Sequence, residues 1–193
     1  KQRREFEAIA ALDFFPSSAR SRAERALAEA EAAVRKLLFA AHAHAVLGPD
    51  ATLLRRTWAT RKPLWADRLA CAWLIRRFVD PEAKMLWLEK AEPPPAEAVG
   101  FGFDGAHFAG SEARVAYEEM LSRLKLAGNP ALARIGAIVQ FLEGRGAPVP
   151  EAAGVHTLLQ GANRRASGET ELMGEAEKTF DLLYEAYYEP AKR

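Results

Sequence analysis

Three arginines surround a lone cysteine on one predicted helix near the middle of the chain. The stretch DRLACAWLIRRFVDP, residues 67–81, has the composition of an apolar helix, yet it contains Arg68, Arg76 and Arg77 around Cys71, the only cysteine. Guanidinium groups stay charged and can donate two parallel hydrogen bonds to one oxyanion. Positive neighbours also lower the pKa of a thiol. These residue types therefore allow oxyanion binding by the arginines or reaction at an activated thiol.

The start of this helix is the predicted anion site. The segment WATR ends just before it, which puts Thr60 and Arg61 near the helix N-terminus, and Asp67 stands at the expected N-cap position. A helix N-terminus presents free N–H groups and a positive dipole end to an anion. Arg61 and Arg68 would add fork-shaped donors, with Asp67 orienting one of them. Arg76 lies two turns deeper, where it could instead support Asp67.

An alternative interpretation treats the same segment as an ordinary core helix. Its arginines would then reach the edges of the buried face and pair with Glu82 or Glu89. Cys71 would be a small hydrophobic residue, and we expect it to be partly buried with packing as its main role. The sequence leaves both interpretations open.

The elements that must position these residues form a strand–helix–strand unit. Residues 53–60 and 85–89 are predicted to be neighbouring parallel strands joined by the helix at Asp67, because so short a crossover gives a right-handed βαβ unit. GFGFDGAHFAG indicates a further strand and turn, and helical segments follow to the C-terminus. The predicted fold class is α/β (α+β): a small, mostly parallel sheet with a βαβ unit, a helical C-terminal half and a long N-terminal helix.

The first part of the chain is predicted to be a separate segment. A helix rich in Ala, Glu, Arg and Leu runs from about residue 19 to residue 46, and LGPD then breaks the chain. Such helices connect or dimerise more often than they catalyse. We therefore expect residues 1–47 to be the end of a truncated upstream domain, since the chain begins with Lys1 rather than Met, and residues 48–193 to be a C-terminal domain.

The composition narrows the class of protein. The 193 residues are 49% hydrophobic and 27% charged, with a net charge of +1, so no overall basic field points to nucleic acid. One cysteine excludes an internal disulfide framework and is typical of a reducing cytoplasm. No apolar run approaches the roughly 20 residues of a membrane span, and no signal-peptide pattern is present. We expect a cytoplasmic protein with no membrane partner.

WATRKPLWADRLACAWLIRRFVDPEAKMLWL closely resembles the signature of the chromate-resistance protein ChrB family, C-terminal domain. GFGFDGAHF, NPALARI and PEAAGVHTLLQG are similar to that family's later blocks. The resemblance implies a role in chromate resistance beside an efflux transporter, and some family members are chromate-responsive transcriptional regulators. The motif residues that carry over are Trp58, Thr60, Arg61, Asp67, Arg68, Cys71, Trp73, Arg76, Arg77 and Asp80, with Asp104 and Glu118 from later blocks.

The chain departs from the family pattern at positions that carry metal-ligand types. The pattern has a histidine near Gly110, a cysteine near Val115 and a His-Asp pair where this chain has Gln140 and Phe141. Glycine and valine cannot coordinate a metal through their side chains. We therefore expect neither a metal nor another cofactor, with His107 and Glu143 as weak metal candidates.

The favoured function is a non-enzymatic, oxyanion-sensing domain of a chromate-responsive transcriptional regulator. Its ligand-binding residues would be Thr60, Arg61, Asp67, Arg68, Cys71, Arg76, Arg77, Asp104 and Glu118, with chromate or a sulfate-like oxyanion as ligand. DNA would be bound only through the upstream domain. One alternative is a metal- or thiol-dependent redox enzyme in chromate detoxification; another is a helical interaction module that forms a homodimer.

Overall fold

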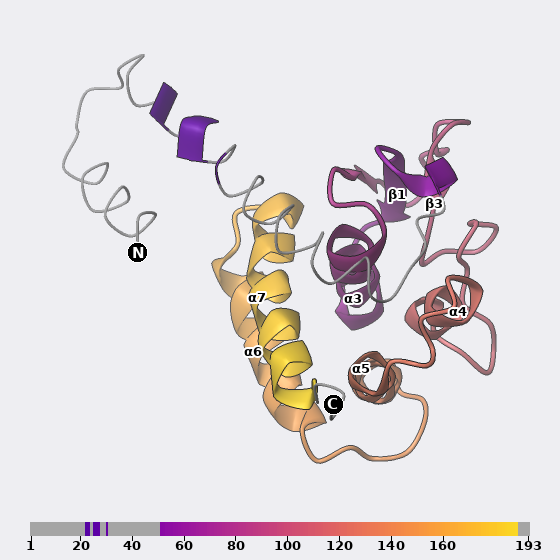
Figure 1. Ribbon diagram of the computed structural model, residues 1–193, viewed down its shortest axis with the longest axis vertical. Coiled ribbons are helices and arrows are strands. Elements are labelled where there is room, and N and C mark those ends of the chain that lie inside the picture. Colours follow the sequence, from indigo (N-terminus) through magenta and orange to yellow (C-terminus); the bar gives the residue numbers. More distant parts are fainter. Residues whose placement is uncertain (1–21, 24, 28–29, 31–50, 189–193) are drawn as a thin grey trace, which may run out of the picture. The chain divides into compact units, whose positions relative to one another are not determined.

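The computed structural model describes residues 22–23, 25–27, 30 and 51–188 (Figure 1). The chain divides into two units, Lys1–His42 and Ala43–Arg193, and the fold described below belongs to the second. Most of the helix predicted over residues 19–46 lies outside the described residues; the few described there are helical. The boundary at residue 47 and the truncated upstream domain remain predictions.

Three parallel strands form the sheet, in the order β2-β1-β3. These are β1 (Thr57–Arg61), β2 (Lys84–Leu88) and β3 (Val99–Gly100). The predicted parallel pair is confirmed, with Trp58 opposite Met85 and Arg61 opposite Leu88. β1 begins later than predicted, because Ala51–Leu53 forms a short 3-10 helix. The N–H groups of Arg55 and Arg56 then donate to the carboxylate of Asp80 instead of to a neighbouring strand.

The crossover helix α3 (Ala66–Leu74) continues into a wider π-helical turn at Ile75–Val79. Every residue from Leu69 to Ile75 is buried. A helix that is apolar all round must be covered on all sides, and α3 packs against α4, α5 and α7, while Trp58 of β1 belongs to the same buried cluster. The predicted N-cap was wrong: Trp65 is the N-cap residue and makes no side-chain cap bond, while Asp67 lies inside the first turn.

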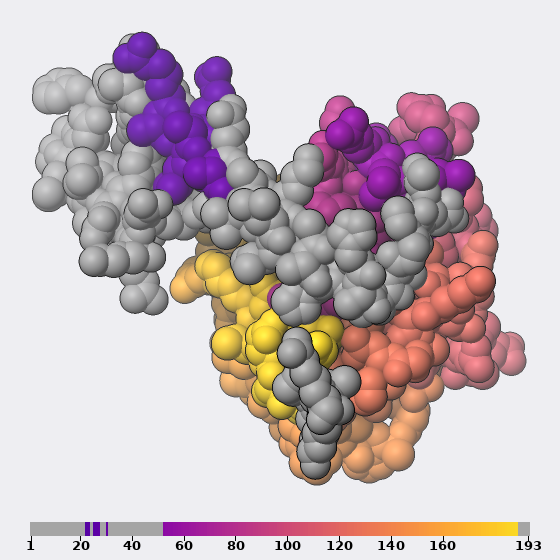
Figure 2. All heavy atoms as spheres, in the orientation of Figure 1, coloured from indigo at the N-terminus to yellow at the C-terminus, as the bar shows by residue number. Residues whose placement is uncertain are grey.

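Four helices make up the C-terminal half: α4 (Ala116–Arg123), α5 (Pro130–Leu142), α6 (Ala152–Arg165) and α7 (Glu169–Tyr187). α5 begins as predicted, with Asn129 Oδ1 accepting from the N–H groups of Ala131 and Leu132 at 3.0 and 3.2 Å. α6 and α7 pack side by side, orange and yellow in the space-filling view (Figure 2). The mixed α/β class is confirmed. No helix among the described residues is long and apolar enough to cross a membrane.

Candidate functional site

A buried hydroxyl without a partner marks the carboxyl edge of the sheet. Thr60 is fully buried near the end of β1, and its Oγ1 has no hydrogen-bond partner among the described residues. A Cβ built on Gly102, just beyond β3, would lie 3.3 Å from this Oγ1 and 3.0 Å from Arg68 Cγ. The structure therefore brings Thr60, Arg68 and Gly102 together, at the edge where parallel sheets collect ligands.

Arg68 is fixed by neutral acceptors. Its Nε donates to the carbonyl of Gly102 at 3.0 Å, and its Nη1 donates to the carbonyl of Pro63 at 2.9 Å. Among the described residues no carboxylate forms an ion pair with it, and its Nη2 has no hydrogen-bond partner. The guanidinium is thus held in place while its charge remains unpaired, as an anion site requires.

Arg61, at the end of β1, also contacts the loop that follows β3. Its guanidinium carbon sits 5.0 Å from the ring centroid of Phe103, and its Nη1 donates to the carbonyls of Glu89 and Lys90. It too forms no ion pair within the described part of the chain. The adjacent residues Gly102 and Phe103 consequently contact one arginine each.

Asp67 caps a helix, but not its own. Its carboxylate accepts from the N–H groups of Ala116 and Tyr117, at 3.1 and 2.9 Å, at the start of α4. The N–H of Asp67 in turn donates to Glu143 Oε1 at 3.0 Å. Burial raises the pKa of Asp67, against the two backbone hydrogen bonds that lower it. Asp67 and Glu143 thus tie α5, α3 and α4 together at the helix ends.

The raised pKa of Asp67 predicts a definite pH dependence. In the window between its ordinary pKa and the raised one, the folded state binds more protons than the unfolded state. The contribution of Asp67 to stability therefore falls as pH rises through that window. Free energies of unfolding measured across it should show the gap between wild type and Asp67→Asn narrowing as pH increases. A gap that widens would mean that the bonds from α4 outweigh burial.

Cys71 is fully buried, more deeply than expected, one turn beyond Asp67. Its Sγ lies 3.8 Å from Asp67 Oδ1. Burial, with the nearby Asp67 carboxylate, raises the pKa of the thiol well above its ordinary value. The thiol therefore stays protonated at neutral pH, and Arg68 does not activate it as a nucleophile.

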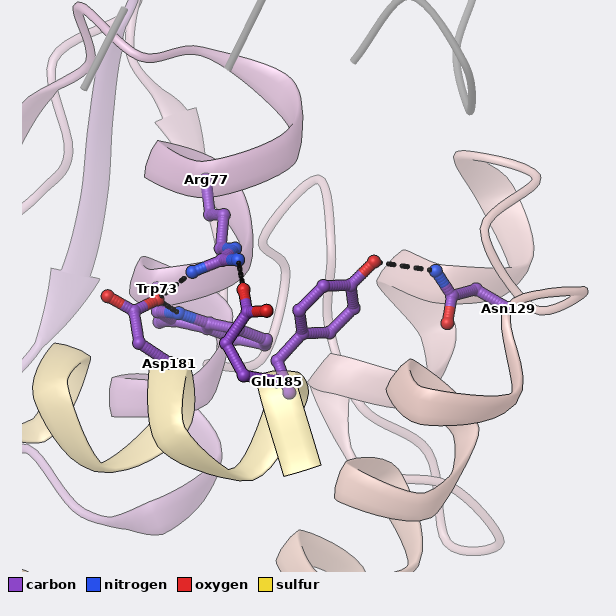
Figure 3. Close-up of polar contacts among 6 residues, drawn as sticks. Trp73, Arg77, Asn129, Asp181 and Glu185 are labelled. Atoms are coloured by element: carbon purple, nitrogen blue, oxygen red, sulfur yellow. Dashed lines mark hydrogen bonds and ion pairs between the residues drawn. The ribbon is translucent and has the colours of Figure 1, made fainter. Parts of the chain in front are cut away.

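Arg76 and Arg77 point away from this edge and pair with α7. Arg76 Nη1 lies 3.1 Å from Glu177 Oε1. Arg77 pairs with Asp181 and Glu185, and Asp181 also accepts from Trp73 Nε1 at 2.8 Å (Figure 3). These ion pairs are of the kind that the core-helix interpretation expects, with α7 supplying the carboxylates.

The proposed partners of those arginines are engaged elsewhere. Glu82 pairs with Arg55 at 3.4 Å, and Glu89 pairs with Lys62 at 2.9 Å. Both are exposed. The acids of α7 lie about 100 residues along the chain from Arg76 and Arg77, so helical spacing alone could not identify them.

No hydrogen bond or ion pair among the described residues joins the remaining predicted residues to Thr60 or Arg68. Asp104 is exposed on the loop after β3, and His107 Nδ1 accepts from the N–H of Gly100 at 3.1 Å. Glu118 is on α4, where its Oε2 is buried and has no hydrogen-bond partner among the residues that the structure describes. Within the described residues, no group of three or more His, Cys, Asp or Glu side chains could hold a metal ion.

Sequence analysis missed the loop that contacts both arginines. The sequence predicted a strand and turn in GFGFDGAHFAG and a ligand-binding role for Asp104, but it did not indicate that Gly102 and Phe103 contact Arg68 and Arg61. An available signal was the glycine between two aromatic residues, directly after a strand that ends at the same edge as β1.

Fold and site together define an α/β domain whose Arg61 and Arg68, at the carboxyl edge of a parallel sheet, form no ion pair with any described residue. The family model described as ChrB, C-terminal domain, matches residues 58–187, so the chain belongs to the chromate-resistance ChrB family. It is 42% identical over 195 residues to Protein ChrB of Cupriavidus metallidurans, covering 98% of this chain and 60% of that protein. No solved structure matches the chain.

Proposed function

We propose that this chain is the oxyanion-sensing domain of a cytoplasmic, chromate-responsive regulator. The observation that carries the proposal is the buried Oγ1 of Thr60 beside the guanidinium of Arg68: within the described part of the chain, the hydroxyl has no hydrogen-bond partner and the guanidinium has no ion pair. A buried hydroxyl without a hydrogen-bond partner destabilises the folded state, so a ligand that supplies the missing hydrogen bond would recover that stability.

The donors left over suit a tetrahedral dianion. Thr60 Oγ1 and Arg68 Nη2 have no partner among the described residues, and Arg61 uses only its Nη1. Chromate and sulfate share charge and shape and accept from several donors at once. Arg76 and Arg77 already bind carboxylates of α7, so we give them no direct contact with the ligand.

Other functions have weaker support. A thiol-dependent enzyme needs an accessible thiolate, whereas Cys71 is buried with a raised pKa. Dimerisation through the N-terminal helix concerns residues that are mostly outside the described ones. The chain spans 60% of the length of Protein ChrB, and we assign it oxyanion sensing and not DNA binding.

Replacing Arg68 with lysine tests the site while keeping its charge. Lysine keeps the charge, but its three donors share one nitrogen and cannot reproduce the planar fork that reaches the carbonyls of Gly102 and Pro63 from separate nitrogens. Affinity should therefore fall about tenfold to hundredfold, the equivalent of one charge-assisted hydrogen bond. Chromate and sulfate are titrated calorimetrically into wild type and Arg68→Lys.

The matched control is Arg165→Lys. Arg165 is an exposed arginine that pairs with Glu175, and both are far from Arg68 in the sequence. This variant should bind both anions as wild type does. Equal affinities for wild type and Arg68→Lys, or no binding by wild type at millimolar anion, would reject the proposed function.

A further inference from the structure

The loop after β3 is closed by its own hydrogen bonds. The N–H of Gly102 donates to the carbonyl of Phe108, and the N–H of Phe108 donates to the carbonyl of Gly100, both at 3.0 Å. Gly102 has a φ of +70°, which favours glycine at this bend. The guanidinium of Arg123 lies 4.8 Å from the ring centroid of Phe108 and further holds the loop end. The loop therefore behaves as a preformed unit.

Phe103 contacts both the strand end and an arginine. A Cβ built on Gly100 would lie only 2.9 Å from Phe103 Cζ, so the ring packs directly on the bare backbone of Gly100. The face of the ring also lies under the Arg61 guanidinium, whose carbon is 5.0 Å from the ring centroid. The absence of a side chain at Gly100 therefore fixes the position of the Phe103 ring, and the ring in turn fixes the position of Arg61.

We propose that Phe103 is a positioning residue of the anion site: its ring holds Arg61 while the adjacent Gly102 carbonyl holds Arg68, so one loop sets the spacing of the two cations. This inference rests on the proposed function. Arginine side chains lose considerable rotamer freedom when they bind, and a residue that orders one in advance strengthens binding without touching the ligand.

The effect should depend on the ring face and not on side-chain volume. A cation is attracted to the π-face of an aromatic ring, which leucine lacks and tyrosine keeps. Phe103 is half-buried at the protein surface, so its replacement should leave the fold intact. Phe103→Leu thus tests the positioning role, and Phe103→Tyr should rescue it.

Sulfate is titrated calorimetrically into wild type, Phe103→Leu, Phe103→Tyr and the control Phe141→Leu, which alters a partly exposed ring on α5. We expect affinity about fivefold weaker for Phe103→Leu and within about twofold of wild type for the other two. NMR of Arg61 Nε–H in the anion-free proteins should show its ring-current shift and order lost only in Phe103→Leu.

The outcomes separate the two proposals. If Arg68→Lys weakens sulfate binding but Phe103→Leu does not, the positioning role is overturned and the anion site stands. An unchanged Arg61 signal in Phe103→Leu also overturns it. If wild type binds no sulfate, both the proposed function and the positioning role of Phe103 are rejected.

Discussion

Replacing Asp80 with alanine is expected to lower the free energy of unfolding by about 3–5 kcal/mol. Asp80 is fully buried after α3, and its carboxylate accepts from the backbone N–H groups of Arg55 and Arg56 and from Trp58 Nε1, at 2.9 to 3.0 Å. Alanine leaves three donors without an acceptor, each costing about 1–3 kcal/mol when buried, less where water can reach. Urea unfolding followed by circular dichroism measures the loss.

Asp104→Ala is the matched control, because Asp104 is also an aspartate but is exposed, on the loop after β3. It should change the stability by less than about 0.5 kcal/mol, as surface substitutions usually do. A loss below about 1 kcal/mol for Asp80→Ala would mean that water replaces the carboxylate, and that this acid does not tie the end of α3 to the start of β1.

Replacing Trp73 with alanine should lower stability by about 3–5 kcal/mol through the cavity left in the core. Trp73 is 1% exposed and packs on Phe78, Phe180 and Tyr184, with ring centroids 5.6 to 6.1 Å apart. It also donates through Nε1 to Asp181 on α7 (Figure 3). The variant should consequently loosen α7 more than the sheet, which hydrogen exchange of α7 amides can detect.

Trp65→Ala provides the comparison for that experiment. Trp65 is half-buried, and its ring meets that of His156 edge-on with the centroids 5.5 Å apart. Folding removes less apolar area from water here than at Trp73, so Trp65→Ala should lower the free energy of unfolding by only about 1–2 kcal/mol. Equal losses for the two variants, or exchange unchanged in α7, would contradict the idea that Trp73 anchors α7 to α3.

Several polar and aromatic residues of the family motif at 58–88 divide into two groups by their contacts. Trp58 and Asp80 bond to each other, and Trp73, Arg76 and Arg77 attach α7 to the crossover helix. These contacts explain why an otherwise apolar helix contains Arg76 and Arg77: both arginines pair with carboxylates of α7. Thr60, Arg61 and Arg68 make no such contacts with carboxylates among the described residues, and this difference singles them out as candidates for binding.

The parallel pair of β1 and β2, the crossover helix and the start of α5 followed from the sequence alone. Each depends on local chemistry: strand formers around an apolar helix, short connections, and Asn129 followed by Pro130. Hydrophobic pattern and capping residues act over a few positions, so they are visible before the chain folds. The βαβ unit therefore needed no tertiary information.

The partner of each charged side chain was decided only by the tertiary structure. Asp67 caps α4 at a separation of about 50 residues, and Arg77 meets acids on α7 more than 100 residues away. An arginine looks the same in a sequence whether it faces a carboxylate, a carbonyl or a ligand. Packing of distant helices neutralises Arg76 and Arg77, while the loop after β3 gives Arg61 and Arg68 only neutral acceptors. That distinction arises from long-range contacts, which no local pattern encodes.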